Sequence, residues 1–330
     1  MPDTVPLGRS PVRVSPLGVG AMKWGEKTRM TAYGGTKSPA DEEAAFRGSL
    51  DAGVTLFDTA EMYGSGNSER RLGELARGTN AMIATKYAPS LAFLPFLPRP
   101  ARHLPKALDA SLARLGRTTV DLYQIHYPVP LVSIRALMSR LADAVQTGKV
   151  RAVGVSNYSE KQIRLAHAAL EARGVPLASN QVQYSLIYRR PEFDGVLGAC
   201  KELGITLLAY MPLAMGALSG KYRPGNAPTD WMRRRMTKTF RPREVESLTG
   251  IVERLVAIGK SHEKSAAQVA LRWVMEQGAL PIPGAKDGIQ ARENAGSATF
   301  TLSQAEVEEL REAAKVWVQE PKWKMSPMSA

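Results

Sequence analysis

The sequence predicts an α/β protein built as a (β/α)8 barrel with an N-terminal β-hairpin. Short runs of β-branched and apolar residues alternate with longer stretches in which apolar residues recur every three or four positions. Eight strand-like runs can be counted, and eight parallel strands with helical crossovers close into a barrel. The chain has 330 residues, 44% of them hydrophobic, so one domain spanning residues 1–330 can bury the necessary core.

The elements follow one another in regular βα order. The predicted strands are Gly18–Met22, Thr55–Asp58, Ala81–Lys86, Leu122–His126, Arg151–Ser156, Ser179–Gln183, Thr206–Tyr210 and Leu280–Pro283. The predicted helices between them include Asp41–Ala52, Leu104–Leu115, Ile134–Thr147, Ser159–Arg173 and Ala266–Gln277. An open doubly wound sheet is the weaker alternative, because "LGVGAMKWG" after the first strand lacks the glycine spacing of a dinucleotide-binding turn.

Two segments lie outside this alternation. Residues 5–20, "VPLGRSPVRVSPLGVG", predict a hairpin that turns at Gly8 and either plugs the bottom of the barrel or decorates its surface. The segment Tyr87–Pro100 carries four prolines among apolar residues, so it cannot be a central strand or a helix interior. It is either a loop folded onto the barrel or an apolar wall of a substrate pocket.

Composition narrows the class of protein. We expect a soluble, cytoplasmic protein without a membrane segment, because there is no signal-like leader and no apolar run of about 18 residues. Cys200 is the only cysteine and is expected in the core, and the four dispersed histidines predict no metal site. The net charge of +13 would suit an anion, but the basic residues are scattered, so we expect no nucleic-acid partner. The one dense cluster, Trp231–Arg243, is either a solvated surface or a clamp for a phosphorylated ligand.

Chemically versatile side chains stand at the expected carboxyl ends of successive strands, which is where barrel enzymes carry their active sites. Asp58 ends the second strand, Lys86 the third and His126 the fourth, while Tyr63 follows Asp58 on a loop at the same end. Asp58 is expected to hold Lys86 by a charge-assisted hydrogen bond, and the nearby ammonium to lower the pKa of Tyr63. His126 is expected to orient a carbonyl or to relay a proton.

Six motifs in order, "FDTAEMYG", "ATKYAP", "LYQIHYP", "VGVSNYS", "LLAYMPLAMGALSGKY" and "IPGAKDGIQARENAG", resemble the aldo-keto reductase superfamily. The likeness covers roughly residues 18–314 and is nearest to the bacterial and chloroplast-type branch, which is related to the group of potassium-channel β subunits. It implies a catalytic tetrad, in which Tyr63 is the general acid, and NADPH bound across the barrel mouth without a Rossmann fold. The tetrad consists of Asp58, Tyr63, Lys86 and His126.

The resemblance also implies a cofactor site. Ser156, Asn157 and Gln181 would hold the nicotinamide carboxamide, Tyr210 would stack on its ring, and Lys286 would favour NADPH over NADH. The backbone from Leu213 to Gly216 and the side chain of Lys221 would meet the phosphates. The complete expected set is Met22, Asp58, Ser156, Asn157, Gln181, Tyr210, Pro212, Leu213, Ala214, Gly216, Lys221, Gly284, Lys286, Gln290, Glu293 and Asn294.

For the substrate, the resemblance implies a small carbonyl compound near Trp24, Tyr63, His126 and Tyr127, reduced to an alcohol with NADPH. The alternative is a cofactor-sensing regulatory subunit on the same fold with little turnover. A barrel hydrolase using Asp58 and a second carboxylate is a third possibility, but no second acid stands at a predicted strand end. We expect a monomer or a weak homo-oligomer.

Overall fold

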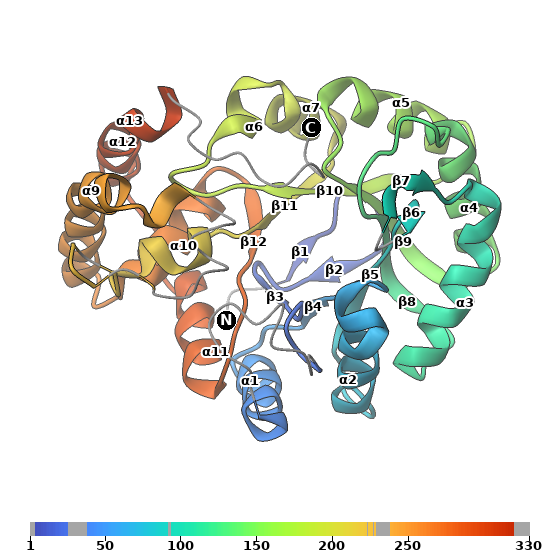
Figure 1. Ribbon diagram of the computed structural model, residues 1–330, viewed down its shortest axis with the longest axis horizontal. Helices are drawn as coiled ribbons and strands as arrows, with labels where there is room; N and C mark the ends of the chain where they lie inside the picture. The colour runs from blue at the N-terminus through green and yellow to red at the C-terminus, as the bar shows by residue number, and fades with distance from the viewer. Residues whose placement is uncertain are drawn as a thin grey trace.

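The computed structural model describes residues 4–25, 38–91, 94–222, 224–226, 228 and 238–319. Eight parallel strands surround a central axis and helices cover them from outside (Figure 1). The barrel strands are β3 (Gly18–Gly20), β4 (Leu56–Asp58), β5 (Met82–Tyr87), β8 (Val120–Ile125), β9 (Val150–Ser156), β10 (Leu177–Gln183), β11 (Thr206–Tyr210) and β12 (Ala279–Ile282). All eight predicted strands are therefore confirmed, with ends that differ by one or two residues.

The sheet closes on itself. Neighbouring strands pair in parallel from β3 through to β12. A parallel bridge between Gly20 and Gly284 then joins the ends, and the N–H of Gly20 donates to the carbonyl of Pro283 at 2.9 Å. The predicted barrel class is confirmed.

The described helices include the five that the periodicity predicts. They are α1 (Pro39–Asp51), α2 (Asn67–Leu75), α3 (Leu104–Leu115), α4 (Ile134–Gln146), α5 (Glu160–Glu171), α6 (Arg190–Phe193), α7 (Val196–Leu203), α9 (Pro242–Ser261), α10 (Ala266–Glu276), α11 (Gly288–Ala295), α12 (Gln304–Ala313) and α13 (Lys315–Gln319). Serine caps at Ser38, Ser159 and Ser265 begin α1, α5 and α10 by capping boxes. Among these described helices, none is both long and apolar enough to cross a bilayer.

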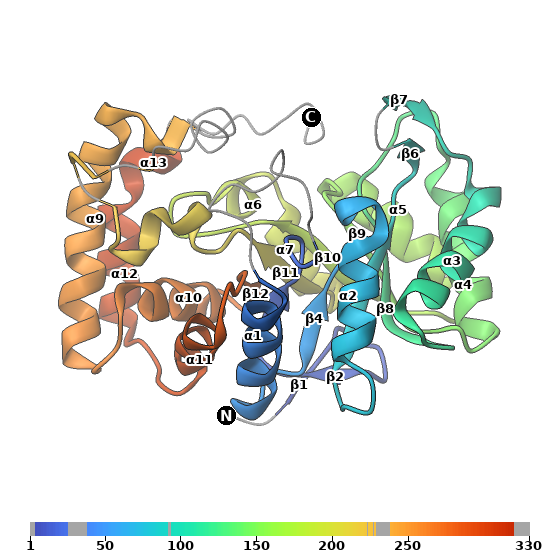
Figure 2. The same ribbon diagram turned by 60° about the horizontal axis from the view of Figure 1, so that its bottom comes forward.

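The N-terminal hairpin plugs the bottom of the barrel. It consists of β1 (Val5–Pro6) and β2 (Arg13–Val14), and Figure 2 shows it at the end of the barrel opposite β6 and β7. Leu7, Val12 and Val14 are fully buried and pack with the inward apolar residues of the barrel strands. The sequence left two alternatives for this hairpin, a plug at the bottom of the barrel or a surface decoration, and the structure has the plug.

The segment Tyr87–Pro100 contains a two-stranded antiparallel ribbon formed by β6 (Ser90–Leu91) and β7 (Leu94–Pro98). It stands apart from the barrel sheet, as its prolines require. Cys200 is buried, as expected. The basic cluster Trp231–Arg243 lies largely outside the described residues.

Candidate active site

A buried acid–lysine pair forms the floor of the barrel mouth. Asp58 ends β4 and Lys86 lies on the neighbouring β5; they are 3% and 0% exposed. The Lys86 ammonium donates to Oδ1 of Asp58 and, at 2.9 Å, to the carbonyl of Thr59. Burial lowers the pKa of Lys86, while the charge of Asp58 and its hydrogen bond oppose that shift. The pair is thus a desolvated cation held by a carboxylate.

Tyr63 and His126 complete the group. Tyr63 begins the short 3-10 turn Tyr63–Gly66, with its N–H donated to the carbonyl of Ala60 at 3.0 Å. The Lys86 nitrogen lies 5.2 Å from the centroid of the Tyr63 ring. The His126 ring meets the Tyr63 ring edge to face, with centroids 5.5 Å apart. The structure therefore brings together all four residues that the sequence assigned to proton transfer.

The pKa of Tyr63 does not follow the sequence-based expectation. Burial and the negative charge of Asp58 raise it above its usual value, whereas the neighbouring ammonium was expected to lower it. Burial is the larger cause, because a phenol away from water is harder to ionise, and the Lys86 ammonium is already paired with Asp58. Burial, together with the charge of Lys86, holds the pKa of His126 well below 6.5. At neutral pH the phenol keeps its proton and the imidazole is uncharged.

Sequence reasoning missed two residues that support this group. Gln124 donates its amide to Oδ2 of Asp58 at 3.2 Å, and its signal was a glutamine on a buried strand, two residues before His126. Glu61 accepts from the N–H of Ala88 at 2.8 Å and pairs with Arg99 at 2.6 Å. Glu61 therefore ties the loop that carries Tyr63 to the chain that follows Lys86.

The residues expected at the nicotinamide lie beside this group and are joined to one another. Asn157 has a positive φ of 60° and donates its side-chain amide to the hydroxyl of Ser156 at 3.1 Å. The Tyr210 hydroxyl donates to Oδ1 of Asn157 at 3.0 Å, and the Ser156 hydroxyl donates to the carbonyl of Gln181 at 2.8 Å. The Gln181 side chain donates to Oδ2 of Asp58 at 2.9 Å, which makes a direct link to the acid–lysine pair.

The loop after β11 has several residues with positive φ, a backbone conformation that is typical of loops that bind phosphate through their N–H groups. Met211, Ala214 and Met215 all have positive φ, at 52°, 48° and 59°. The N–H groups of Ala214 and Gly216 already donate within the loop, to the carbonyls of Met211 and Leu213. Among the described residues, the amides of Leu213 and Met215 have no backbone acceptor, so of the expected donors these two are the candidates for an anion. Pro212 is buried here, whereas the Lys221 side chain is exposed.

The residues expected around the adenosine end lie along α11 and in the short segment that precedes it. Its N-cap is Asp287, which accepts from the N–H of Gln290 at 2.9 Å. The Gln290 side chain accepts from the N–H of Lys286 at 3.2 Å, and Asn294 donates to the carbonyl of Gly284 at 3.3 Å. Glu293 accepts from the hydroxyl of Ser265 at 2.7 Å. These contacts fix one short segment at the barrel rim, because Gly284 also pairs with Gly20.

Three more residues that were expected to contact the substrate or the cofactor differ in burial and in hydrogen bonding. Trp24 is 2% exposed, packs with Phe46 and Phe57, and donates its indole N–H to the carbonyl of Ala285 at 3.1 Å. This burial argues against a contact between Trp24 and a substrate. Tyr127 is 5% exposed and shares a hydrogen bond of 2.7 Å with Ser90 of the ribbon. Met22 is partly buried after β3.

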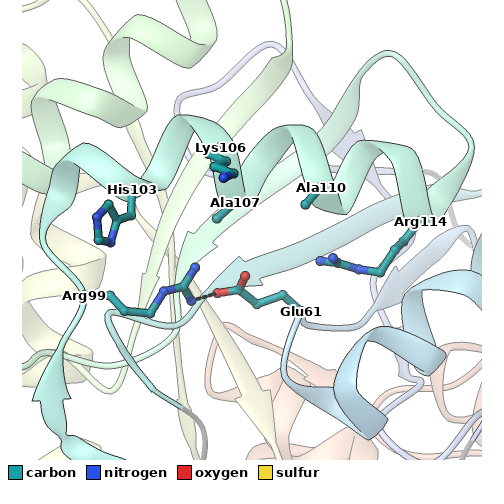
Figure 3. A pocket seen from close by; sticks show the side chains of 7 residues that line it. All are labelled: Glu61, Arg99, His103, Lys106, Ala107, Ala110 and Arg114. Carbon is teal, nitrogen blue, oxygen red and sulfur yellow. Dashed lines mark hydrogen bonds and ion pairs between the residues drawn. The ribbon is translucent and has the colours of Figure 1, made fainter.

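A separate hollow of ≈ 490 Å³ lies beside α3 (Figure 3). Its lining residues are Glu61, Arg99, His103, Lys106, Ala107, Ala110 and Arg114, none of which belongs to the tetrad. Arg99 is paired with Glu61, and Arg114 with the buried Glu69 at 2.5 Å. Because both arginines already have carboxylate partners, we place the chemistry at the barrel mouth.

Known proteins resemble this chain in sequence over most of its length. The family model described as "Aldo/keto reductase family" matches residues 16–315. Pyridoxal reductase, chloroplastic, of Arabidopsis thaliana is 34% identical over 328 residues, which cover 92% of this chain and 84% of the relative. Aldo-keto reductase yakc of Schizosaccharomyces pombe, whose name specifies NADP(+), is also 34% identical and covers 84% of each chain.

Solved structures also resemble this chain over nearly its whole length. The glycerol dehydrogenase AKR11B4 from Gluconobacter oxydans superposes with a TM-score of 0.81 at 25% identity, covering 98% of each chain. The thermostable aldo-keto reductase Tm1743, solved with the inhibitor epalrestat, gives a TM-score of 0.73 at 27% identity, covering 94% of this chain and all of the other.

Proposed function

The chain belongs to the aldo/keto reductase family, and we propose that it reduces aldehydes or ketones to alcohols with NADPH, Tyr63 acting as the general acid. The observation that carries this proposal is the packing of Tyr63 between Lys86 and His126, with Asp58 behind the lysine. A phenol beside a neutral imidazole and a buried ammonium can protonate a carbonyl oxygen as it becomes an alkoxide.

The residues present fit a nicotinamide dinucleotide. Asn157 and Gln181 offer side-chain amides beside the tetrad, the Met211–Gly216 backbone has the positive φ angles of an anion cradle, and Lys286 lies at the rim. When bound, the cofactor supplies the hydride. In this proposal Asn157, Ser156 and Gln181 orient the carboxamide, Tyr210 packs against the ring, and Lys286 binds the 2′-phosphate.

The proposed proton path uses the chain's own groups. Tyr63 holds its proton at neutral pH because burial raises the pKa of its hydroxyl. His126, uncharged because burial and Lys86 lower the pKa of its ring, orients the carbonyl oxygen as a hydrogen-bond donor. The Lys86 ammonium, which Asp58 holds in place, stabilises the phenolate that Tyr63 becomes after the proton is transferred.

A panel of carbonyl compounds tests this function. Aromatic aldehydes come first, because pyridoxal, in the name of the Arabidopsis relative, is an aromatic aldehyde. Steady-state oxidation of NADPH and of NADH would be measured with each compound, and the reverse oxidation with glycerol. We expect turnover of at least one aldehyde, faster with NADPH. Tight NADPH binding without turnover of any carbonyl would instead favour a cofactor-sensing subunit.

A further inference from the structure

The buried carboxylate of Asp58 accepts hydrogen bonds from Lys86 of the tetrad and also from two side chains outside the tetrad. Lys86 occupies Oδ1, while Oδ2 accepts from Gln124 at 3.2 Å and from Gln181 at 2.9 Å. Asp58 is only 3% exposed, so these side chains replace the water that would otherwise solvate its charge. A hydrogen bond to a carboxylate favours its charged form and fixes its orientation.

The register of the sheet places Gln124 at this point. In β5 and β8, Lys86 and Gln124 are Cα partners, and Gln124 is in turn the partner of Gly154 in β9. Side chains at paired positions of adjacent parallel strands project to the same face, so Gln124 stands beside Lys86 inside the barrel. An ideal Cβ at Gly154 would lie 3.1 Å from Cγ of Gln124, which shows how closely the glutamine packs against that glycine.

A glutamine at position 124 lowers the stability of the fold, so a purely structural role would not explain it. Its side chain is fully buried, and Oε1 has no hydrogen-bond partner among the described residues. An unsatisfied buried acceptor destabilises a fold, and an apolar side chain of similar size would avoid that cost. The amide N–H to Asp58 is therefore the contact that explains a glutamine here.

Gln181 differs from Gln124 in one respect. Its amide donates to Asp58 in the described structure, and the proposed function also requires it at the nicotinamide carboxamide. If Gln181 turns to the cofactor, Gln124 is the side-chain amide that remains on Oδ2.

We propose that Gln124 is a positioning residue, whose amide fixes the orientation of the Asp58 carboxylate so that Lys86 stays beside Tyr63. This role rests on the proposed reductase function. It adds a fifth side chain on which the acidity of the reacting group depends.

The primary test is Gln124→Met, which keeps the length of the side chain and removes the donor. We expect kcat/KM to fall by roughly 10- to 100-fold, the loss that accompanies removal of a hydrogen bond to a charged group. The loss should appear in kcat and not in KM, because the substitution disturbs the group that transfers the proton and leaves the contacts of the bound carbonyl in place. The Kd for NADPH should change by less than about threefold, since Gln124 is not among the cofactor contacts.

Gln124→Glu provides an opposing signature. When protonated, the new carboxyl can donate to Asp58 in place of the amide; when ionised, it repels Asp58. Its activity should therefore approach that of the parent at low pH and fall as pH rises, whereas Gln124→Met lacks the donor at every pH and should keep the same deficit. A merely structural role would give Gln124→Glu no such dependence on pH.

Gly154→Ala disturbs Gln124 without removing it. The added methyl would crowd Cγ of Gln124 at 3.1 Å and the hydroxyl of Ser179 at 2.3 Å, so we expect a similar loss of kcat. Gln183→Met is the matched control, because Gln183 is a buried glutamine on β10 and is not one of the side chains that donate to Asp58 in the described part of the chain. It should leave kcat unchanged. Thermal unfolding of each variant verifies that it folds.

A readout without turnover separates this inference from the proposed function. Carboxyl ¹³C NMR of the ligand-free protein, with the Asp58 signal assigned by Asp58→Asn, reports the hydrogen bonding of that carboxylate directly. The signal should shift in Gln124→Met and not in Gln183→Met, whether or not any carbonyl is reduced. An unshifted Asp58 signal together with parental kcat/KM in a folded Gln124→Met protein would overturn the positioning role, whereas absence of turnover in the parent would overturn only the reductase.

Discussion

The rings of Tyr63 and His126 meet edge to face, with centroids 5.5 Å apart and planes at 83°. They come from different elements, since Tyr63 lies on the turn after β4 and His126 directly follows β8. Because burial raises the pKa of the phenol and lowers that of the imidazole, both are neutral near pH 7. In the proposed function, a carbonyl oxygen between them would meet two neutral hydrogen-bond donors, and the phenol would transfer its proton.

Tyr63→Phe should abolish most reductase activity and leave NADPH binding intact. The substitution removes the hydroxyl but keeps the ring that packs against His126. General acid catalysis contributes typically 10²- to 10⁴-fold, so kcat should fall by about that factor. Steady-state kinetics and fluorescence titration with NADPH measure the two effects.

Tyr158→Phe is the matched control for that experiment. Tyr158 is 1% exposed, and its hydroxyl has no hydrogen-bond partner among the described residues. Turnover should survive this change. Parental turnover in Tyr63→Phe would show that another group donates the proton.

The fold could be predicted from the sequence because its signals are local. Each barrel strand is a short apolar run, and helices such as α5 and α10 begin at serine capping boxes. The tetrad was also predictable, because the ends of parallel strands meet at one rim of a barrel. The ribbon at β6 and β7 was not predicted, since its prolines excluded a central strand but could not indicate an isolated antiparallel pair.

Partnerships across the barrel could not be predicted. The hydrogen bonds of Gln124 and Gln181 to Asp58 span 66 and 123 positions in sequence, so no local pattern encodes them. The direction of the pKa shift at Tyr63 depends first on how deeply the phenol is buried and then on the nearby charge of Asp58, and both are properties of the folded chain.

Lys286→Ala should weaken NADPH binding more than NADH binding. In the proposed function this ammonium meets the 2′-phosphate, which NADH lacks. Loss of a charged hydrogen bond corresponds to about a tenfold increase in Kd for NADPH, with little change for NADH. Lys161→Ala, at an exposed position of α5, should leave both constants unchanged. An equal loss for both cofactors would contradict the 2′-phosphate role.

His126 should make the free energy of unfolding depend on pH. Its folded pKa lies well below 6.5, while an unfolded histidine has a pKa of about 6.5. The unfolded chain therefore binds the extra proton, and stability present above that pH is lost as pH falls toward the folded pKa. Between pH 7.5 and 5.5 the parent should lose about 1.4 kcal/mol more than His126→Asn. Urea denaturation at both pH values measures this difference, and equal losses would show that the imidazole is not desolvated.

Gly8→Ala should destabilise the protein by dislodging the hairpin plug. Gly8 has a φ of +57°, and an ideal Cβ there would lie 2.4 Å from the carbonyl oxygen of Ala178 at the bottom of the barrel. The N–H of Gly8 also donates to Oγ1 of Thr206 at 2.7 Å, so a shift of the turn would break a contact with β11.

Gly78→Ala separates the clash from the backbone strain. Gly78 has a comparable φ of +71°, but nothing lies within 4 Å of its ideal Cβ. Both substitutions incur the cost of a left-handed alanine, roughly 1–2 kcal/mol, and only Gly8→Ala adds the overpacking cost of about 1–3 kcal/mol. Urea denaturation should therefore find Gly8→Ala less stable by that second amount. If both variants lose the same free energy, the hairpin yields to the added methyl group and does not plug the barrel tightly.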